Sequence, residues 1–172
     1  SLGWVESDAE LRSRNGQGAV HARSRNALAY PSALRAAAGQ PQSAVFGKKD
    51  YQQLAIIREL TEQLCLPIDI VSAETVRAED GLALSSRNRF LSEAEREEAP
   101  RMRDTMSSIK AAILDGDRKY VAMEYAAGAR LARYGWNVDY VVIRAQKGLR
   151  RPTEDETKLV VLGAATLGST RL

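Results

Sequence analysis

One strand–helix–strand pattern constrains the fold of this chain more than any other feature. Ala44–Phe46 is a short apolar run of strand type, and Ile68–Val71 has the pattern of a second strand. Between them, four apolar residues recur at helical spacing: Leu54, Ile57, Leu60 and Leu64. They predict a helix from about Asp50, a good N-cap residue, to Leu64, with Pro67 as the stop signal. Strands joined by a helix pair in parallel, so the pattern predicts an α/β protein containing a βαβ unit.

The turn between the first strand and the helix carries two adjacent lysines. Lys48 and Lys49 follow Gly47 directly. The N-terminus of a helix carries a partial positive charge and free N–H groups, so lysines placed there oppose the helix dipole. A bound anion such as a phosphate would offset that cost. The alternative is a pair of solvated lysines near Asp50, and the spacing does not match the Walker phosphate loop.

Composition excludes several classes of protein. The 172 residues suffice for one good-sized domain or two small ones, and 44% of them are hydrophobic, as in ordinary globular proteins. The apolar runs are too short to span a membrane. The single cysteine, Cys65, rules out a disulfide framework within the chain, fits a reducing compartment and is expected to pack at the helix end. The net charge of +3 permits an anionic small-molecule substrate and does not by itself indicate nucleic acid.

The N-terminal quarter has no clear hydrophobic period. Short helices are expected at Ser7–Ser13 and Ser32–Ala38, and residues 1–40 are expected to pack poorly because no apolar stripe there matches the sheet. The only histidine, His21, lies among small and basic residues, where a surface position is more common than a catalytic one. Arginines scattered over this segment would suit a nucleic-acid-binding arm, but aromatic stacking partners are nearly absent.

A compact polar loop follows the βαβ unit. Asp80 and Gly81 form a turn signal, and Ser85, Ser86 and Arg87 come shortly after it. Hydroxyl groups and a forked guanidinium group are donors suited to phosphate oxygens. The alternative is an ordinary polar turn between two domains.

The C-terminal half predicts a small α+β domain. Ser92 to Glu95 reads as a capping box, and Pro100 is expected to kink or restart the helix that begins there. The methionines of this helix are expected in the core rather than at a cofactor. The further elements expected are the continuation of this helix to Ile113, a helix at Arg118–Tyr134 and strands at Trp136–Ile143 and Lys158–Ala165.

Two motifs together resemble one enzyme family. F-G-K-K-D-Y-Q-Q-L at Phe46–Leu54 and D-G-L-A-L-S-S-R-N at Asp80–Asn88 are similar to those of pantothenate synthetase (pantoate–β-alanine ligase), and the similarity covers about residues 41–172. The resemblance implies a Rossmann-like nucleotidyl-transferase domain followed by a C-terminal lid domain. It also implies a cytoplasmic homodimer that uses ATP and Mg²⁺ to condense pantoate with β-alanine through a pantoyl adenylate.

The resemblance also assigns roles to individual positions. The catalytic residues would be Lys49, Ser85, Ser86 and Arg87, and Gln53 would hydrogen-bond pantoate. Position 48 is often glutamate in the family, so Lys48 is expected to contact ATP through its backbone. No metal-ligating side chain is expected. The full set of expected ATP contacts is Gly47, Lys48, Lys49, Asp50, Val76, Leu84, Ser85, Ser86 and Arg87.

The same comparison predicts an incomplete enzyme. Residues 1–40 are expected to be a leader that does not match the family, as a shifted reading frame or false start would produce. Residues 41–80 would be a remnant of the ATP- and pantoate-binding domain, and residues 81–172 the lid. The family's H-x-G-H signature is not in this sequence, and family members usually continue beyond Leu172. Three functions stay open: a pantoate-activating ligase, a non-catalytic nucleotide-binding remnant of that family, and a basic nucleic-acid-binding module.

Overall fold

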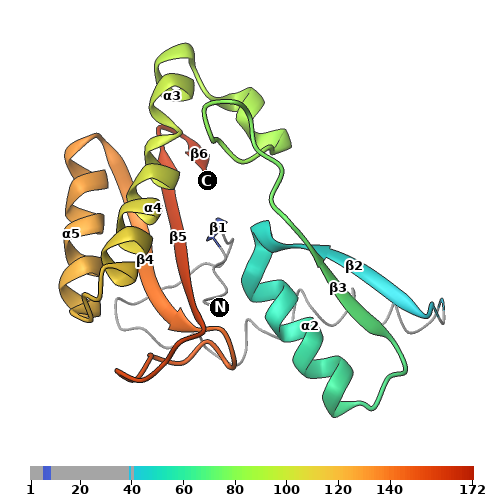
Figure 1. The fold of residues 1–172 in the computed structure, drawn as a ribbon. Helices are drawn as coiled ribbons and strands as arrows, with labels where there is room; N and C mark the ends of the chain where they lie inside the picture. The colour runs from blue at the N-terminus through green and yellow to red at the C-terminus, as the bar shows by residue number, and fades with distance from the viewer. Residues whose placement is uncertain (1–5, 9–38, 40) are drawn as a thin grey trace.

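The computed structural model describes residues 6–8, 39 and 41–172. In this part of the chain the strands form two sheets, and helix α2 (Tyr51–Gln63) lies between them (Figure 1). The predictions for Ser32–Ala38 and His21 fall outside the described residues. Where the chain is described, no helix is both long and apolar enough to cross a membrane.

The predicted βαβ unit is confirmed. Strands β2 (Ser43–Gly47) and β3 (Asp69–Ala73) pair in parallel, with Val45 opposite Val71. A short 3₁₀ helix, η1 (Lys48–Asp50), leads into α2. The α/β class predicted from the sequence is therefore correct.

Both ends of α2 differ from the sequence prediction in their local structure. Asp50 occupies the N-cap position, but its carboxylate makes no capping hydrogen bond. Its φ of −96° and ψ of 59° lie outside the extended region that N-cap residues use, because the 3₁₀ turn precedes it. At the other end, Cys65 and not Pro67 stops the helix: Cys65 has a φ of 49°, and Leu66 N–H donates to the carbonyl of Thr61 at 3.0 Å. This is a Schellman ending formed without glycine.

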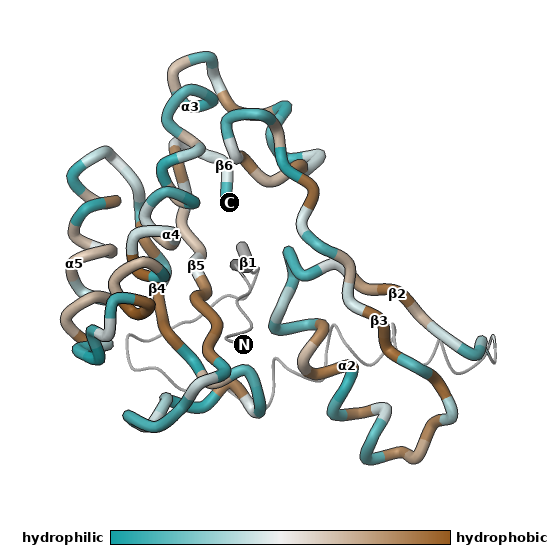
Figure 2. The backbone as a smooth tube through the Cα atoms, viewed as in Figure 1, coloured by the Kyte–Doolittle hydropathy of each residue, from teal (hydrophilic) through white to brown (hydrophobic). Residues whose placement is uncertain are grey.

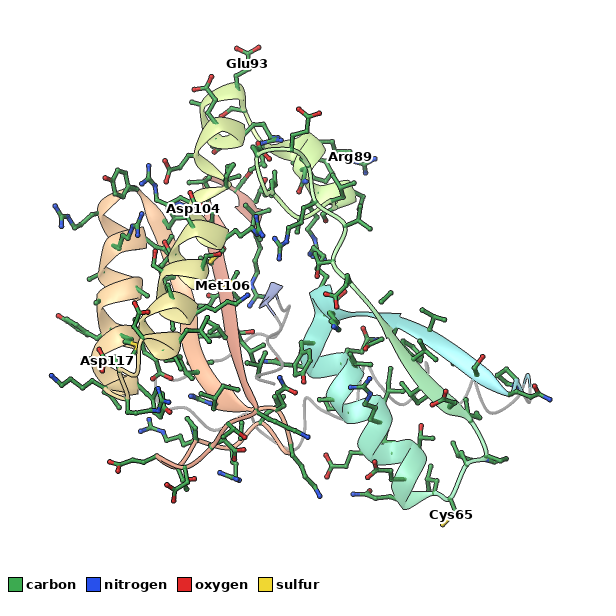
Figure 3. The ribbon with its side chains drawn as sticks, in the orientation of Figure 1. Cys65, Arg89, Glu93, Asp104, Met106 and Asp117 are labelled. Atoms are coloured by element: carbon green, nitrogen blue, oxygen red, sulfur yellow. The ribbon has the colours of Figure 1, made fainter. Side chains whose placement is uncertain are left out.

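The left-handed conformation also overturns the expected packing of Cys65. The thiol is exposed, and Figure 3 shows it at the far end of α2, pointing away from the molecule. A helix that ends at Gln63 carries the next turn of chain out of the core, so the apolar spacing does not extend to this residue.

The C-terminal half forms the predicted α+β arrangement. Its capping box at Ser92 is present, and Pro100 separates two helices rather than kinking one. Helices α4 (Arg101–Leu114) and α5 (Tyr120–Arg133) pack against the sheet of strands β4 (Trp136–Ala145) and β5 (Leu159–Leu167), which are antiparallel. The other elements are η2 (Ser86–Phe90), α3 (Glu93–Glu98) and β6 (Thr170–Arg171).

Strand β5 is buried on both faces. One face packs on α4 and α5, and the other packs on α2. This explains why nearly all residues of the strand are apolar, and Figure 2 shows part of β5 in brown. Gly163 leaves room for two methionines, since a Cβ there would lie 3.0 Å from Met102 Sδ and 3.3 Å from Met106 Sδ. The prediction that the methionines of helix α4 are core residues is confirmed, because Met102 and Met106 are both buried (Figure 3 labels Met106).

The expectation for the N-terminal segment is partly wrong. Strand β1 (Glu6–Asp8) pairs in parallel with β5 at Val161–Gly163. Two residues of the helix expected at Ser7–Ser13 are therefore in a strand, and these three residues do join a sheet. A backbone ladder needs no apolar stripe, which is why side-chain patterning did not reveal it.

Candidate functional site

The carboxyl ends of β2 and β3 carry the first candidate motif. In open parallel sheets, ligands bind at this edge, where the loops leave the strands. Gly47 ends β2 opposite Ala73, which ends β3. The η1 turn follows Gly47 directly, so the predicted residues Gly47, Lys48, Lys49 and Asp50 all lie at this edge.

Lys48 has a partner that the sequence did not suggest. Its Nζ forms an ion pair with the carboxylate of Glu74, the residue after β3. The lysine is mostly buried and the glutamate is exposed. A protein carboxylate therefore offsets the unfavourable interaction of the lysine charge with the helix dipole. Neither a bound anion nor exposure to solvent is needed to explain a lysine at this position. The pair also ties the η1 turn to the segment that follows β3.

Two neighbouring glutamines of α2 point in different directions. Gln52 is 4% exposed, and its Nε2 donates to the hydroxyl of Tyr140 on β4 at 3.3 Å. Gln53 is only partly buried. Successive helical residues are about 100° apart, so one glutamine can hold α2 on the second sheet while the other faces elsewhere. Sequence analysis assigned no role to Gln52. The only signal for this contact in the sequence was the presence of two adjacent glutamines on the helix.

The second candidate motif begins as a small hairpin. Leu84 N–H donates to the carbonyl of Val76 at 2.9 Å, and an antiparallel bridge joins Arg77 to Ala83. Gly81, with a φ of 93°, forms the turn. Val76 and Leu84 are thus opposite each other, and their side chains share one face of the hairpin. Both side chains are exposed, so two separated residues of the predicted set form one apolar surface.

Charged side chains fix the turn of this hairpin. Arg96 forms an ion pair with Asp80, whose other oxygen accepts from Leu82 N–H at 3.1 Å. The hydrogen bond from Arg96 has the largest effect on the pKa of Asp80 and lowers it below its usual value. The hydrogen bond from Leu82 N–H lowers it further. Arg77 Nη1 donates to the carbonyl of Gly81 at 3.1 Å. The predicted turn is therefore present, and these three side-chain interactions stabilise it.

The serine–arginine segment continues from the hairpin into η2. Ser85 Oγ accepts from Arg87 N–H at 3.3 Å, so this hydroxyl caps the 3₁₀ helix. Asn88 Nδ2 donates to the carbonyl of Ala83 at 3.0 Å and ties η2 back to the hairpin. Ser86 is exposed and Arg87 is partly buried. Asn88 is a further support that sequence analysis did not assign, although it lies inside the motif.

The two motifs are connected through the segment after β3. Glu74 pairs with Lys48, and Val76 lies two positions further along and bonds to Leu84. The predicted residues therefore form two groups rather than one cluster. The Lys48–Glu74 ion pair and the short segment from Glu74 to Val76 connect the two groups. The cavity of about 540 Å³ beside α2 is lined by other residues, including Tyr51, Gln52 and Lys147, and by none of the predicted set.

The described residues do not form a metal site. No three histidine, cysteine, aspartate or glutamate side chains among them are grouped to hold an ion. Of the two carboxylates at the η1 turn among these residues, Glu74 is paired with Lys48 and Asp50 is exposed. The described residues around the η1 turn therefore do not offer a set of protein ligands for Mg²⁺.

Solved structures of pantothenate synthetases match this fold. One from Thermus thermophilus matches with a TM-score of 0.73 and 31% identity, covering 84% of this chain and 52% of that one. A second from the same organism matches with a TM-score of 0.70 and 33% identity, covering 82% of this chain and 51% of that one. The chain thus spans about half the length of these relatives.

A more distant structure shares the fold. The pantoate–β-alanine ligase of Francisella tularensis matches with a TM-score of 0.53 and 20% identity, covering 95% of this chain and 56% of that one. The sequence model of the family described as pantoate–β-alanine ligase matches residues 36–172. This match begins slightly before the boundary expected at residue 41 and covers most of the chain. The chain therefore belongs to the pantoate–β-alanine ligase family.

Proposed function

We propose that this chain is the nucleotide-binding and lid part of an enzyme that condenses pantoate with β-alanine at the expense of ATP. The observation that carries the proposal is the connection between the two motifs. The η1 turn lies at the carboxyl edge of a parallel sheet, and the Lys48–Glu74 pair links it to the hairpin that precedes Ser85, Ser86 and Arg87. Such an arrangement offers backbone N–H groups, hydroxyls and a guanidinium group to one polyphosphate ligand.

The apolar pair on the hairpin suits the base of ATP. Val76 and Leu84 are 67% and 54% exposed and lie opposite each other. An adenine ring placed on them would remove both from water. Gly47, Lys48 and Asp50 would line the nucleotide from the η1 side, with Lys48 contributing its backbone because its ammonium group is engaged by Glu74. Asp50 has an exposed carboxylate that can accept a hydrogen bond from a ribose hydroxyl.

The first chemical step would be adenylation. The pantoate carboxylate attacks the α-phosphorus of ATP, the bond from that phosphorus to the bridging oxygen breaks, and pyrophosphate leaves with the electron pair. Negative charge moves onto the leaving group in this step. Lys49, Ser85, Ser86 and Arg87 are the donors assigned to stabilise that charge, and such stabilisation acts mainly on the transition state.

The second step would be amide formation. The amine of β-alanine attacks the acyl carbon of the pantoyl adenylate, AMP leaves, and the amine loses a proton. This step needs mainly that the adenylate and the amine be held together. Gln53, a partly buried residue of α2, is the residue assigned to orient pantoate.

Several properties of the family belong to this proposal. The crystal of the Francisella tularensis ligase holds β,γ-ATP and β-alanine, which supports ATP and β-alanine as substrates here. Residues 41–80 would serve as part of the ATP- and pantoate-binding domain, and residues 81–172 as the lid. A cytoplasmic homodimer and a requirement for Mg²⁺ as the ATP chelate also belong to the proposal. Full activity would require the half of the family fold that this chain does not span.

Two measurements separate this proposal from its alternatives. Titration of the chain with ATP and with a single-stranded oligonucleotide should give saturable binding of ATP and a weaker, salt-sensitive response to the oligonucleotide. Pantoate-dependent exchange of pyrophosphate into ATP should appear once the other half of the fold is supplied. ATP binding without exchange under that condition would instead identify a non-catalytic nucleotide-binding protein. Tight oligonucleotide binding without ATP binding would overturn the assignment.

A further inference from the structure

One inserted residue in strand β4 changes the face of the sheet on which its side chains lie. Val138 and Tyr140 are two positions apart on β4, yet they lie opposite consecutive residues of β5. Asp139 is therefore the inserted residue of a β-bulge. Val138 packs in the core cluster of α4 and α5, whereas Tyr140 packs in the cluster that contains α2 residues. Residues two apart on a regular strand share one face, so the bulge is what turns Tyr140 toward α2.

An ion pair holds the bulge in place. Arg171 Nε on β6 donates to the carboxylate of Asp139 at 2.7 Å, and both side chains are mostly buried. Strands β4 and β6 both pair with β5, so this contact ties the inserted residue to a second strand of the same sheet. The direction of the Tyr140 side chain therefore follows from a fixed feature of the sheet.

The partner of Tyr140 on α2 is a buried glutamine. Gln52 is 4% exposed, and its Nε2 donates to the Tyr140 hydroxyl at 3.3 Å. Its Oε1 is also buried and has no hydrogen-bond partner within the described part of the chain. A buried polar atom without a partner destabilises a fold, and an apolar side chain at this position would avoid that loss. A glutamine here is therefore explained by its bond to Tyr140 and not by packing.

This glutamine lies in the first turn of α2, beside the residue assigned to pantoate. The helix begins at Tyr51, directly after the η1 turn. Gln53 follows Gln52 and points about 100° away around the helix axis. A hydrogen bond that fixes the Gln52 side chain restricts rotation of this turn about the axis, and it therefore also fixes the direction of Gln53.

We propose that Tyr140 is a positioning residue for pantoate binding. Its hydroxyl holds Gln52, and through the first turn of α2 it sets the direction of Gln53. The C-terminal half of the chain thus determines the geometry of the pantoate contact on the βαβ unit without touching pantoate. This inference rests on the proposed function for the role of Gln53.

The first experiment measures pantoate-dependent ATP–pyrophosphate exchange. It uses the chain joined to the part of the Thermus thermophilus pantothenate synthetase that lies outside the match. Tyr140→Phe removes only the hydroxyl and should raise the pantoate concentration for half-maximal exchange about threefold, as expected for one neutral hydrogen bond. The maximal rate and the ATP dependence should change by less than about 1.5-fold. A lower maximal rate with an unaltered pantoate dependence would overturn the proposal.

Tyr125→Phe is the matched control for this experiment. Tyr125 lies on α5 and is 80% exposed, so loss of its hydroxyl should leave the pantoate dependence, the ATP dependence and the maximal rate unchanged. An equal rise in the pantoate requirement in both variants would show that the effect does not come from the position of Tyr140, and it would overturn the proposal.

A substitution at Gln52 separates positioning from packing. Gln52→Met keeps the approximate size of the side chain and removes the unpaired Oε1. Its thermal midpoint should not fall by more than about 2 °C, while its pantoate requirement should rise as in Tyr140→Phe. Adding Tyr140→Phe to Gln52→Met should have no further effect, because both remove the same bond. An unaltered pantoate dependence in Gln52→Met, or a rise that always accompanies a loss of stability, would overturn the proposal.

The last experiment needs no catalysis. In the present chain, isotope-labelled on its glutamine side chains, nuclear magnetic resonance should show that Tyr140→Phe shifts the side-chain amide signal of Gln53. The signal of Gln63, at the other end of α2, should stay in place. An unshifted Gln53 signal would overturn the proposal. A shifted signal in a protein whose joined form shows no exchange would refute the proposed function and leave the positioning of Gln53 by Tyr140 in place.

Discussion

The backbone N–H of Leu84 donates to the carbonyl of Val76 at 2.9 Å, and this bond makes one surface from two residues that the sequence keeps apart. It closes the hairpin that leads into Ser85 and Arg87. The hairpin is joined in turn to the η1 turn by Glu74 and Lys48. The proposed nucleotide site depends on this bridge.

Leu84→Ala should weaken ATP binding about fivefold. The substitution removes apolar area that would contact adenine, which corresponds to about 1 kcal/mol. Isothermal titration with ATP measures the change. Leu114→Ala, at a side chain of α4 that is 49% exposed where Leu84 is 54% exposed, serves as the control. Equal affinities for ATP in the Leu84→Ala variant and the original chain would remove Leu84 from the site.

Lys49→Ala should slow pantoate-dependent ATP–pyrophosphate exchange by about a hundredfold or more, with a smaller change in ATP affinity. The charge of Lys49 is assigned to the leaving pyrophosphate, so its loss should act on the rate. The assay uses the chain joined to the other half of the fold. Lys158→Ala, at an exposed lysine before β5, should leave the exchange rate unchanged. An unaltered rate in Lys49→Ala would leave this residue out of the chemistry.

Gln53→Ala should instead raise the pantoate concentration needed for half-maximal exchange. A neutral hydrogen bond to a bound substrate contributes about 0.5–1.5 kcal/mol, which corresponds to about a two- to tenfold effect. The maximal rate should change less than the pantoate dependence. If Gln53→Ala lowered the maximal rate and left the pantoate dependence unaltered, the assignment of Gln53 to pantoate would be wrong.

Gly163→Ala should destabilise the C-terminal domain by about 1–3 kcal/mol. A new Cβ would lie 3.0 Å from Met102 Sδ and 3.3 Å from Met106 Sδ, so the packed core must shift to admit it. Urea unfolding measures the change. Gly128→Ala on α5 is the matched control, because a Cβ there meets nothing within 4 Å and alanine favours the helix by about 1 kcal/mol. Equal stability of the two variants would contradict this account of β5 packing.

Part of the stability should be lost in acid. The hydrogen bond from the Arg101 guanidinium holds the pKa of Glu98 below its usual value, and a further hydrogen bond from Trp136 Nε1 at 3.0 Å acts in the same direction. A carboxyl group whose pKa is lowered by folding stabilises the protein above its unfolded pKa and loses that contribution as the pH falls through its folded pKa. Urea midpoints measured between about pH 6 and pH 3 should fall less steeply for Glu98→Gln. Parallel pH profiles would show that Glu98 contributes nothing.

The elements that sequence analysis predicted correctly depend on local signals. The spacing of Leu54 and Ile57 predicted helix α2. The capping box predicted the start of α3, and Pro100 predicted the start of a new helix, α4. Each of these signals acts within one or two helical turns. The parallel pairing of β2 and β3 could be predicted because adjacent strands joined by a crossover helix usually pair in parallel.

The parts that could not be predicted depend on contacts between distant residues. The Lys48–Glu74 pair joins positions 26 apart in the sequence, and the Gln52–Tyr140 bond joins positions 88 apart. The exposed position of Cys65 came from a left-handed residue that is usually glycine, so the sequence carried no turn signal there. Spacing alone contains no information on such contacts.

Formation of pantothenate is the most direct test of the proposed ligase activity. The chain is joined to the Thermus thermophilus segment outside the match and supplied with pantoate, β-alanine, ATP and Mg²⁺. Pantothenate and AMP should form in equal amounts, and formation should depend on both the joined segment and Lys49. The chain alone should form neither product. A properly folded fusion that binds ATP yet yields no pantothenate would contradict the assignment as a ligase, and so would product formation that is unchanged in Lys49→Ala and Arg87→Ala.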